Sequence, residues 1–91
     1  MCLAIIAMNV HPDWPLIVAA NRDEFHARPA QAMQPWPESA TLQAGRDLLA
    51  GGTWLGLTAQ GKFALLTNVR DPAHHRHRAP SRGALVQRYL Q

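Results

Sequence analysis

The sequence predicts an α+β fold in which antiparallel strands are followed by a C-terminal helix. Two short apolar runs, at residues 2–8 and 16–20, are separated by a segment with two prolines and an aspartate, which is typical of paired strands. A second β-rich pair lies at residues 53–58 and 62–69, on either side of a glycine-containing turn. Residues 81–90 place apolar side chains at helical spacing, which indicates a short amphipathic helix.

The composition of each segment predicts its environment. The first run is continuously apolar, so we expect a strand that is buried on both faces. Residues 28–38 contain three prolines and are expected to form an irregular surface loop, while residues 41–49 fit neither strand nor helix clearly. Ser81 follows a proline and is the expected N-cap of the helix. The expected apolar face of this helix consists of Leu85, Val86, Tyr89 and Leu90.

The length of the chain, its apolar N-terminal run and its single cysteine indicate what kind of protein it is and where it is found. The 91 residues allow one small domain. The longest apolar run, Met1 to Met8, is far shorter than the roughly 20 residues that a membrane-spanning helix requires. No Lys or Arg precedes Arg22, whereas a secretory signal peptide carries positive charge before its apolar run. The single cysteine, Cys2, fits a reducing compartment. We therefore expect a cytoplasmic protein with no membrane span.

The net charge of +3 is unevenly distributed, because five of the nine basic residues lie between Arg70 and Arg88. No aromatic residue is interleaved with these arginines, so a solvated loop and helix face is favoured over nucleic-acid binding. His74, His75 and His77 lack the spacing of zinc ligands, and neighbouring arginines would repel a divalent cation. The sequence thus predicts no metal site, no bound cofactor and no nucleic-acid partner.

Cys2 has the most distinctive chemistry in the chain. Removal of Met1 would leave Cys2 at the N-terminus with both a thiol and a free α-amine. An α-amine has a pKa of about 7.7–8.0, so it can act as a general base toward the thiol of the same residue. One residue then supplies nucleophile and base together. The alternative is a small apolar residue at the head of a buried strand, which position alone favours.

Asn21, Asp23 and Asn68 are the other candidate catalytic residues. Asn21 and Asp23 follow the second apolar run and, in an extended segment, point to the same side. Asn68 ends a later predicted strand, where a side-chain amide can donate to a developing oxyanion. Each has a structural alternative, namely a salt-bridged turn around Asp23 and a turn-forming asparagine at position 68.

These features occur in an order that resembles the NRDE family, also called the transport and Golgi organisation 2 family. The matching motifs are Met1-Cys2, His11-Pro12-x-x-Pro15-Leu16-Ile17, Ala19-Ala20-Asn21-Arg22-Asp23-Glu24-Phe25, Arg28-Pro29, Ala44-Gly45-Arg46-Asp47, Gly51-Gly52-Thr53-Trp54-Leu55-Gly56, Leu66-Thr67-Asn68-Val69-Arg70 and Ser81-Arg82-Gly83. Because members of the family are more than twice as long, we expect residues 1–91 to be the N-terminal portion of a single domain, inactive by itself.

The resemblance implies an N-terminal-nucleophile hydrolase fold, an α/β/β/α sandwich of which the predicted strands and helix would form part. Similar enzymes, such as conjugated bile acid hydrolase, penicillin V acylase and acid ceramidase, begin with Met-Cys and cleave amide bonds. By this resemblance Cys2 is the nucleophile and Asp23 orients its α-amine. The oxyanion would be bound by Asn21 or Asn68.

Arg22 and Trp54 are the expected substrate contacts. In the similar enzymes an arginine stands directly before the asparagine of this run, whereas Ala20 occupies that place here and Arg22 comes after it. Trp54 either packs in the core or offers an aromatic wall to an apolar ligand.

The predicted function is therefore hydrolysis of an amide or acyl substrate by an N-terminal cysteine. The alternative is a non-catalytic protein that binds and traffics haem, lipid or acyl-CoA, since members of this family have been linked to those ligands and to Golgi organisation. A purely structural role ranks last. A half-formed sandwich would expose an apolar sheet face, so we also expect association into a homo-oligomer.

Overall fold

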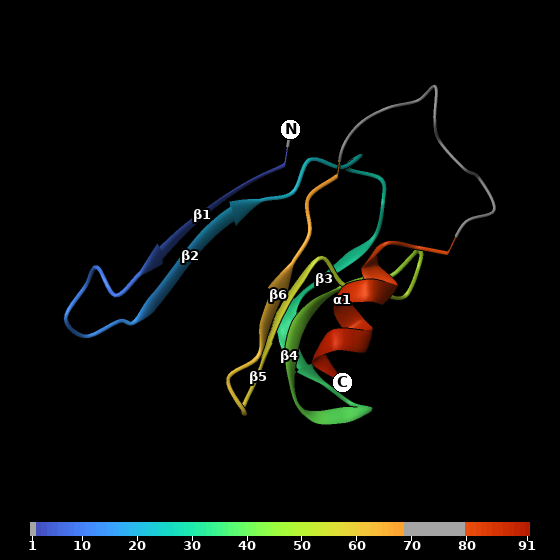
Figure 1. Ribbon diagram of the computed structural model, residues 1–91. Helices are drawn as coiled ribbons and strands as arrows, with labels where there is room; N and C mark the ends of the chain where they lie inside the picture. Colours follow the sequence, from blue (N-terminus) through green and yellow to red (C-terminus); the bar gives the residue numbers. More distant parts are fainter. Residues whose placement is uncertain (1, 69–79) are drawn as a thin grey trace.

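The computed structural model describes residues 2–68 and 80–91 of the chain. Its elements are β1 (Leu3–Met8), β2 (Leu16–Asn21), β3 (Ala30–Trp36), β4 (Ser39–Asp47), β5 (Leu55–Thr58), β6 (Phe63–Leu65) and α1 (Gly83–Leu90). β1 and β2 form a two-stranded sheet, and the other strands form a four-stranded sheet in the order β3-β4-β5-β6. All neighbouring strands are antiparallel. Figure 1 shows α1 lying against the four-stranded sheet, while the β1–β2 hairpin extends away from it.

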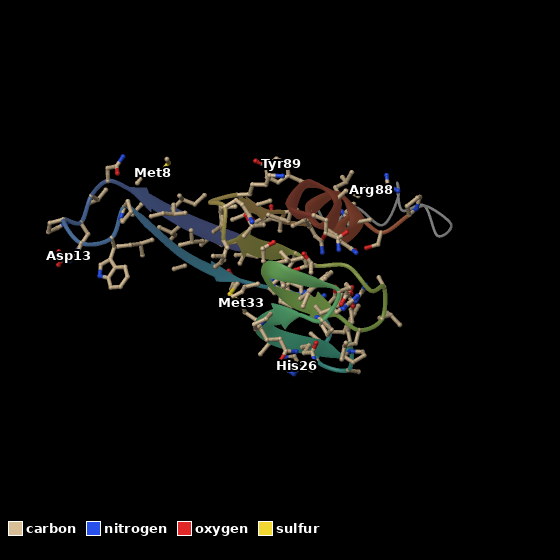
Figure 2. All side chains as sticks on the ribbon, turned by 90° about the horizontal axis from the view of Figure 1, so that it is seen from below. Met8, Asp13, His26, Met33, Arg88 and Tyr89 are labelled. Carbon is tan, nitrogen blue, oxygen red and sulfur yellow. The ribbon has the colours of Figure 1, made fainter. Side chains whose placement is uncertain are left out.

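The β1–β2 hairpin confirms the first predicted strand pair. Its register runs from Leu3 opposite Asn21 to Met8 opposite Leu16. The expectation that the first strand is buried on both faces is wrong for the described part of the chain, because neither the four-stranded sheet nor α1 covers the hairpin. Ile5 is 64% exposed on one face and Met8 is 68% exposed on the other. Figure 2 shows side chains projecting from both faces of the hairpin, with Met8 at its far end.

The four-stranded sheet contains one strand where a loop was expected. β3 lies within the proline-rich segment, and its Pro35 is tolerated because β3 is an edge strand with irregular register beside Trp36. The segment at 41–49, which fitted no class clearly, belongs largely to β4. The predicted second hairpin is confirmed as β5 and β6, with Leu57 opposite Phe63, although both strands are shorter than expected.

The core lies between the four-stranded sheet and α1. Its buried apolar residues are Trp36, Leu42, Ala44, Val86 and Leu90. Gly56 permits this packing, since a Cβ atom there would lie 2.8 Å from Leu90 Cδ1 and 2.9 Å from Ala44 Cβ. Burial of these side chains between the sheet and α1 is the main source of stabilisation among the described residues.

The N-cap of α1 is Arg82, one residue after the expected Ser81, and Arg82 makes no side-chain cap hydrogen bond. The apolar face of α1 is also narrower than expected. The Ser81 hydroxyl accepts a hydrogen bond from the Gly83 N–H at 3.2 Å, directly before the helix begins. Val86 and Leu90 are buried, whereas Leu85 and Tyr89 are 67% and 56% exposed. Tyr89 lies on the outer side of α1 in Figure 2. No helix among the described residues is long and apolar enough to cross a membrane.

Candidate active site at Cys2

Three segments of the chain meet at the Cys2 thiol. Cys2 directly precedes β1 and is partly buried. Its Sγ accepts a hydrogen bond from the backbone N–H of Asp23, two residues beyond β2, at 3.3 Å. A second backbone hydrogen bond comes from Asn68, which follows β6. In Figure 1 the chain after β6 runs back toward the start of β1. Segments that are far apart in the sequence therefore supply two donors to one sulfur atom.

The electrostatics of this site favour the thiolate. The backbone hydrogen bond from Asn68, followed by that from Asp23, lowers the pKa of the Cys2 thiol. Desolvation by burial and the negative charge of Asp23 act in the opposite direction, but the donors outweigh them. Because the thiolate is the reactive form of cysteine, this environment makes Cys2 a better nucleophile near neutral pH.

Asn21 holds the backbone next to Cys2. It is the last residue of β2 and stands opposite Leu3 in the register of the hairpin. Its side-chain Oδ1 accepts a hydrogen bond from the Leu3 N–H at 3.1 Å.

Arg22 and Trp54, the two predicted substrate contacts, stack on each other. The Arg22 guanidinium carbon lies 4.3 Å from the centre of the Trp54 ring, which is a cation–π contact. Trp54 in turn lies across Gly45, where a Cβ atom would come within 2.6 Å of the indole ring. The aromatic wall predicted from the sequence is therefore packed against the four-stranded sheet and covered by an arginine.

Asp47 is a further residue of this region that the sequence analysis did not single out as functional. It is 7% exposed and accepts two hydrogen bonds from Arg28, at 3.2 and 2.6 Å. The Arg22 guanidinium lies 3.7 Å from the same carboxylate. Burial raises the pKa of Asp47, but hydrogen bonds from Arg28 and from the backbone at Leu49 hold it below its ordinary value. The available signal was its place at the end of the Ala44-Gly45-Arg46-Asp47 motif.

The structure thus brings Cys2, Asp23 and the Asn68 backbone together, with Asn21 beside them. The histidine cluster at 74, 75 and 77 lies outside the described residues. Within the parts of the chain that are described, no group of three or more His, Cys, Asp or Glu side chains can hold a metal ion. The arrangement provides a nucleophile with backbone donors.

The fold and the site define a strand-rich protein whose lone cysteine is held where three segments meet. Residues 1–91 match the family described as Transport and Golgi organisation 2. The chain belongs to this family.

Relatives from mammals and insects support the assignment. The chain is 40% identical over 97 residues to the Transport and Golgi organization protein 2 homolog of Bos taurus, covering 99% of the chain and 35% of that protein. It is 32% identical over 100 residues to Transport and Golgi organization protein 2 of Drosophila melanogaster, with the same coverage of 99% and 35%. The chain therefore spans about a third of the length of these relatives. No solved structure matches it.

Proposed function

We propose that this protein is an amidohydrolase of the N-terminal-nucleophile type, with Cys2 as its nucleophile. The observation that carries the proposal is the convergence of two backbone N–H groups, from Asp23 and Asn68, on the Cys2 sulfur. A buried structural cysteine needs no such donors, whereas an activated cysteine requires an environment that favours the thiolate.

The proposed reaction begins once Met1 has been removed. The α-amine of Cys2 takes the thiol proton, and the sulfur attacks the carbonyl carbon of the substrate amide. The C–N bond of the tetrahedral intermediate then breaks, and the leaving amine receives the proton from the α-ammonium group. Water hydrolyses the resulting thioester with the α-amine again as base, which releases the acid and restores the thiol.

The neighbouring residues take distinct parts in this proposal. The negative charge of Asp23 raises the pKa of the thiol, so Asp23 suits orientation of the α-ammonium group rather than activation of the sulfur. The two backbone donors already contact the sulfur, so stabilisation of the oxyanion falls to the side-chain amides of Asn21 or Asn68. Arg22 and Trp54, stacked on each other, would contact the substrate beyond the scissile bond.

We further propose that the whole protein forms an α/β/β/α sandwich. The four-stranded sheet already carries a helix on one side, as one half of such a sandwich would. The apolar side chains on both faces of the hairpin support the same proposal, because a strand between two layers is apolar on both faces.

The activity is proposed for the whole protein, so its test uses the natural full-length chain. We expect hydrolysis of at least one member of a panel of acyl p-nitroanilides with acyl groups of increasing length. Cys2→Ala should abolish turnover, and Cys2→Ser should retain a small part of it. Gln60→Ala, an exposed turn substitution, is the matched control and should leave turnover unchanged.

Two outcomes would count against the hydrolase. If Cys2→Ala turns over the panel as well as the wild type does, Cys2 is not the nucleophile. If no member of the panel is cleaved, and a haem titration gives a Soret shift that survives Cys2→Ala, the protein is a ligand-binding protein of the trafficking type.

A further inference from the structure

The segment from Arg22 to Arg28, which carries Asp23, is fixed to the four-stranded sheet at both of its ends. Arg22, which precedes Asp23, lies 3.7 Å from the Asp47 carboxylate. Arg28, at the other end of the segment, makes a two-point hydrogen-bonded ion pair with the same carboxylate. One acid therefore binds both flanks of the segment whose backbone N–H contacts the Cys2 sulfur.

Asp47 is itself held rigidly. It ends β4, where its backbone carbonyl accepts the Gly51 N–H at 2.7 Å and its Oδ1 accepts the Leu49 N–H at 3.0 Å. The next residue joins the two segments again, since the Leu48 N–H donates to the Pro29 carbonyl at 3.0 Å. A carboxylate held in this way has a fixed position from which to hold the two arginines.

The second donor to the thiol is joined to the same cluster through Trp54. The Trp54 ring stacks with Arg22, and its backbone carbonyl accepts the Leu66 N–H at 2.9 Å. Leu66 stands two residues before Asn68, which supplies the other hydrogen bond to the sulfur. Both thiol donors thus depend on contacts that lead to Asp47 and its arginines.

We propose that Asp47 is a positioning residue of the Cys2 site, which fixes the Asp23 backbone N–H against the sulfur through Arg22 and Arg28. The Asp47 carboxylate accepts hydrogen bonds from Arg28 and from the Leu49 N–H, so Asp47 acts on the thiol through other residues. The inference rests on the proposed function only in treating the thiol as the nucleophile. A role of Asp47 in positioning predicts a change in the reactivity of the thiol, and this prediction requires no knowledge of the substrate.

A similar cluster elsewhere on the sheet provides a matched control. Arg46 pairs with Glu38 at 2.5 Å and stacks on Trp36, with its guanidinium carbon 4.1 Å from the ring centre. This cluster repeats the combination of acid, arginine and tryptophan but is not joined by any of these contacts to the segment that carries Asp23. Glu38→Gln therefore breaks a comparable ion pair without releasing that segment.

The test measures alkylation of Cys2 by iodoacetamide as a function of pH, read from the mass of the N-terminal peptide of the full-length protein. Asp47→Asn should move the midpoint of the profile upward and slow alkylation at pH 7 by about three- to tenfold, because only the thiolate reacts. Arg28→Lys, which keeps the charge but loses the two-point geometry, should give a smaller shift in the same direction. Glu38→Gln should give the wild-type profile. The charges that act on the thiol, those of Asp23 and the amino terminus, are the same in all variants.

A folded Asp47→Asn variant with the wild-type midpoint would overturn the inference. If Asp47→Asn does not fold, Arg28→Lys decides, and an unshifted midpoint in that variant overturns it equally. An equal shift in Glu38→Gln would also overturn it, since the effect would then follow from any ion pair on the sheet. The proposed hydrolase fails separately, if Cys2→Ala retains turnover, whatever the alkylation profiles show.

Discussion

The hairpin and the four-stranded sheet are built from similar apolar strands but are stabilised very differently. In the sheet, α1 covers one face, and Leu42 on β4 is fully buried. In the hairpin, apolar side chains such as Ile6 and Ile17 remain half exposed to solvent. A strand pair without a covering layer is marginally stable in water. The stability of the hairpin therefore depends on the hydrogen bonds at its Cys2 end, because no layer covers its faces among the described residues.

This contrast bears directly on the site. Cys2, the proposed nucleophile, lies at the edge of the weakly supported hairpin. The segments that donate to its sulfur are anchored on the well-packed sheet through Asp47 and Trp54. The geometry of the site is thus imposed by the sheet on the hairpin. Four substitutions test this division, beginning with the largest expected effect.

Leu42→Ala should destabilise the protein by about 2–5 kcal/mol, because it leaves a cavity in the only apolar core of the described residues. In residues 1–91, where Ile5 is mostly exposed, the hairpin counterpart Ile5→Ala should cost less than about 1 kcal/mol. Burial between the layers of the proposed sandwich would raise this cost toward that of Leu42→Ala. Urea denaturation followed by circular dichroism measures both. Equal costs would mean that the hairpin faces are covered as well as the core is.

Asp47→Asn should lower the free energy of unfolding by about 2 kcal/mol at pH 7, through loss of charge-assisted hydrogen bonds. The folded-state pKa of Asp47 is depressed, so its contribution is fully present above the unfolded value of about 3.9 and is lost as pH falls through the folded value. The difference in the free energy of unfolding between wild type and variant should therefore shrink below about pH 4. Urea denaturation at pH 7 and pH 3 checks the sign, and a difference that grows on acidification would contradict it.

Asn21→Ala should have a local effect of about 1 kcal/mol, confined to the Cys2 end of the hairpin. The substitution removes the acceptor of the Leu3 N–H, so exchange of the Leu3 amide should accelerate. Amides of β4 and β5 should keep their wild-type protection in the same hydrogen-exchange experiment. Faster exchange across β4 would show that the hairpin and the sheet unfold together.

The elements that sequence predicted correctly are those set by local patterns. The β1–β2 pair follows from two apolar runs around a proline-containing turn. The helix start was predicted to within one residue, since the N-cap is Arg82 and the Ser81 hydroxyl accepts the Gly83 N–H. β3 was missed because prolines disfavour a strand unless it lies at an edge, and edge position is a property of the whole sheet.

The residues of the candidate site could be named from the sequence, but their arrangement could not. Residue type and the family resemblance pointed to Cys2 and Asp23, yet their contact depends on the hairpin register, which places Leu3 opposite Asn21. The role of Asp47 was not predictable, because its partner Arg28 is 19 residues away in the chain and on another segment. Such pairs are fixed by the folded sheet and leave no local pattern in the sequence.

Whether Cys2 is an N-terminal nucleophile is best tested by the intact mass of the protein purified from its native host. The mechanism requires a free α-amine on Cys2, so we expect a chain lighter than the encoded one by its initiator methionine, with Cys2 at the amino end of the N-terminal peptide. Retention of Met1 would contradict it, because Cys2 would then have no α-amine to act as base.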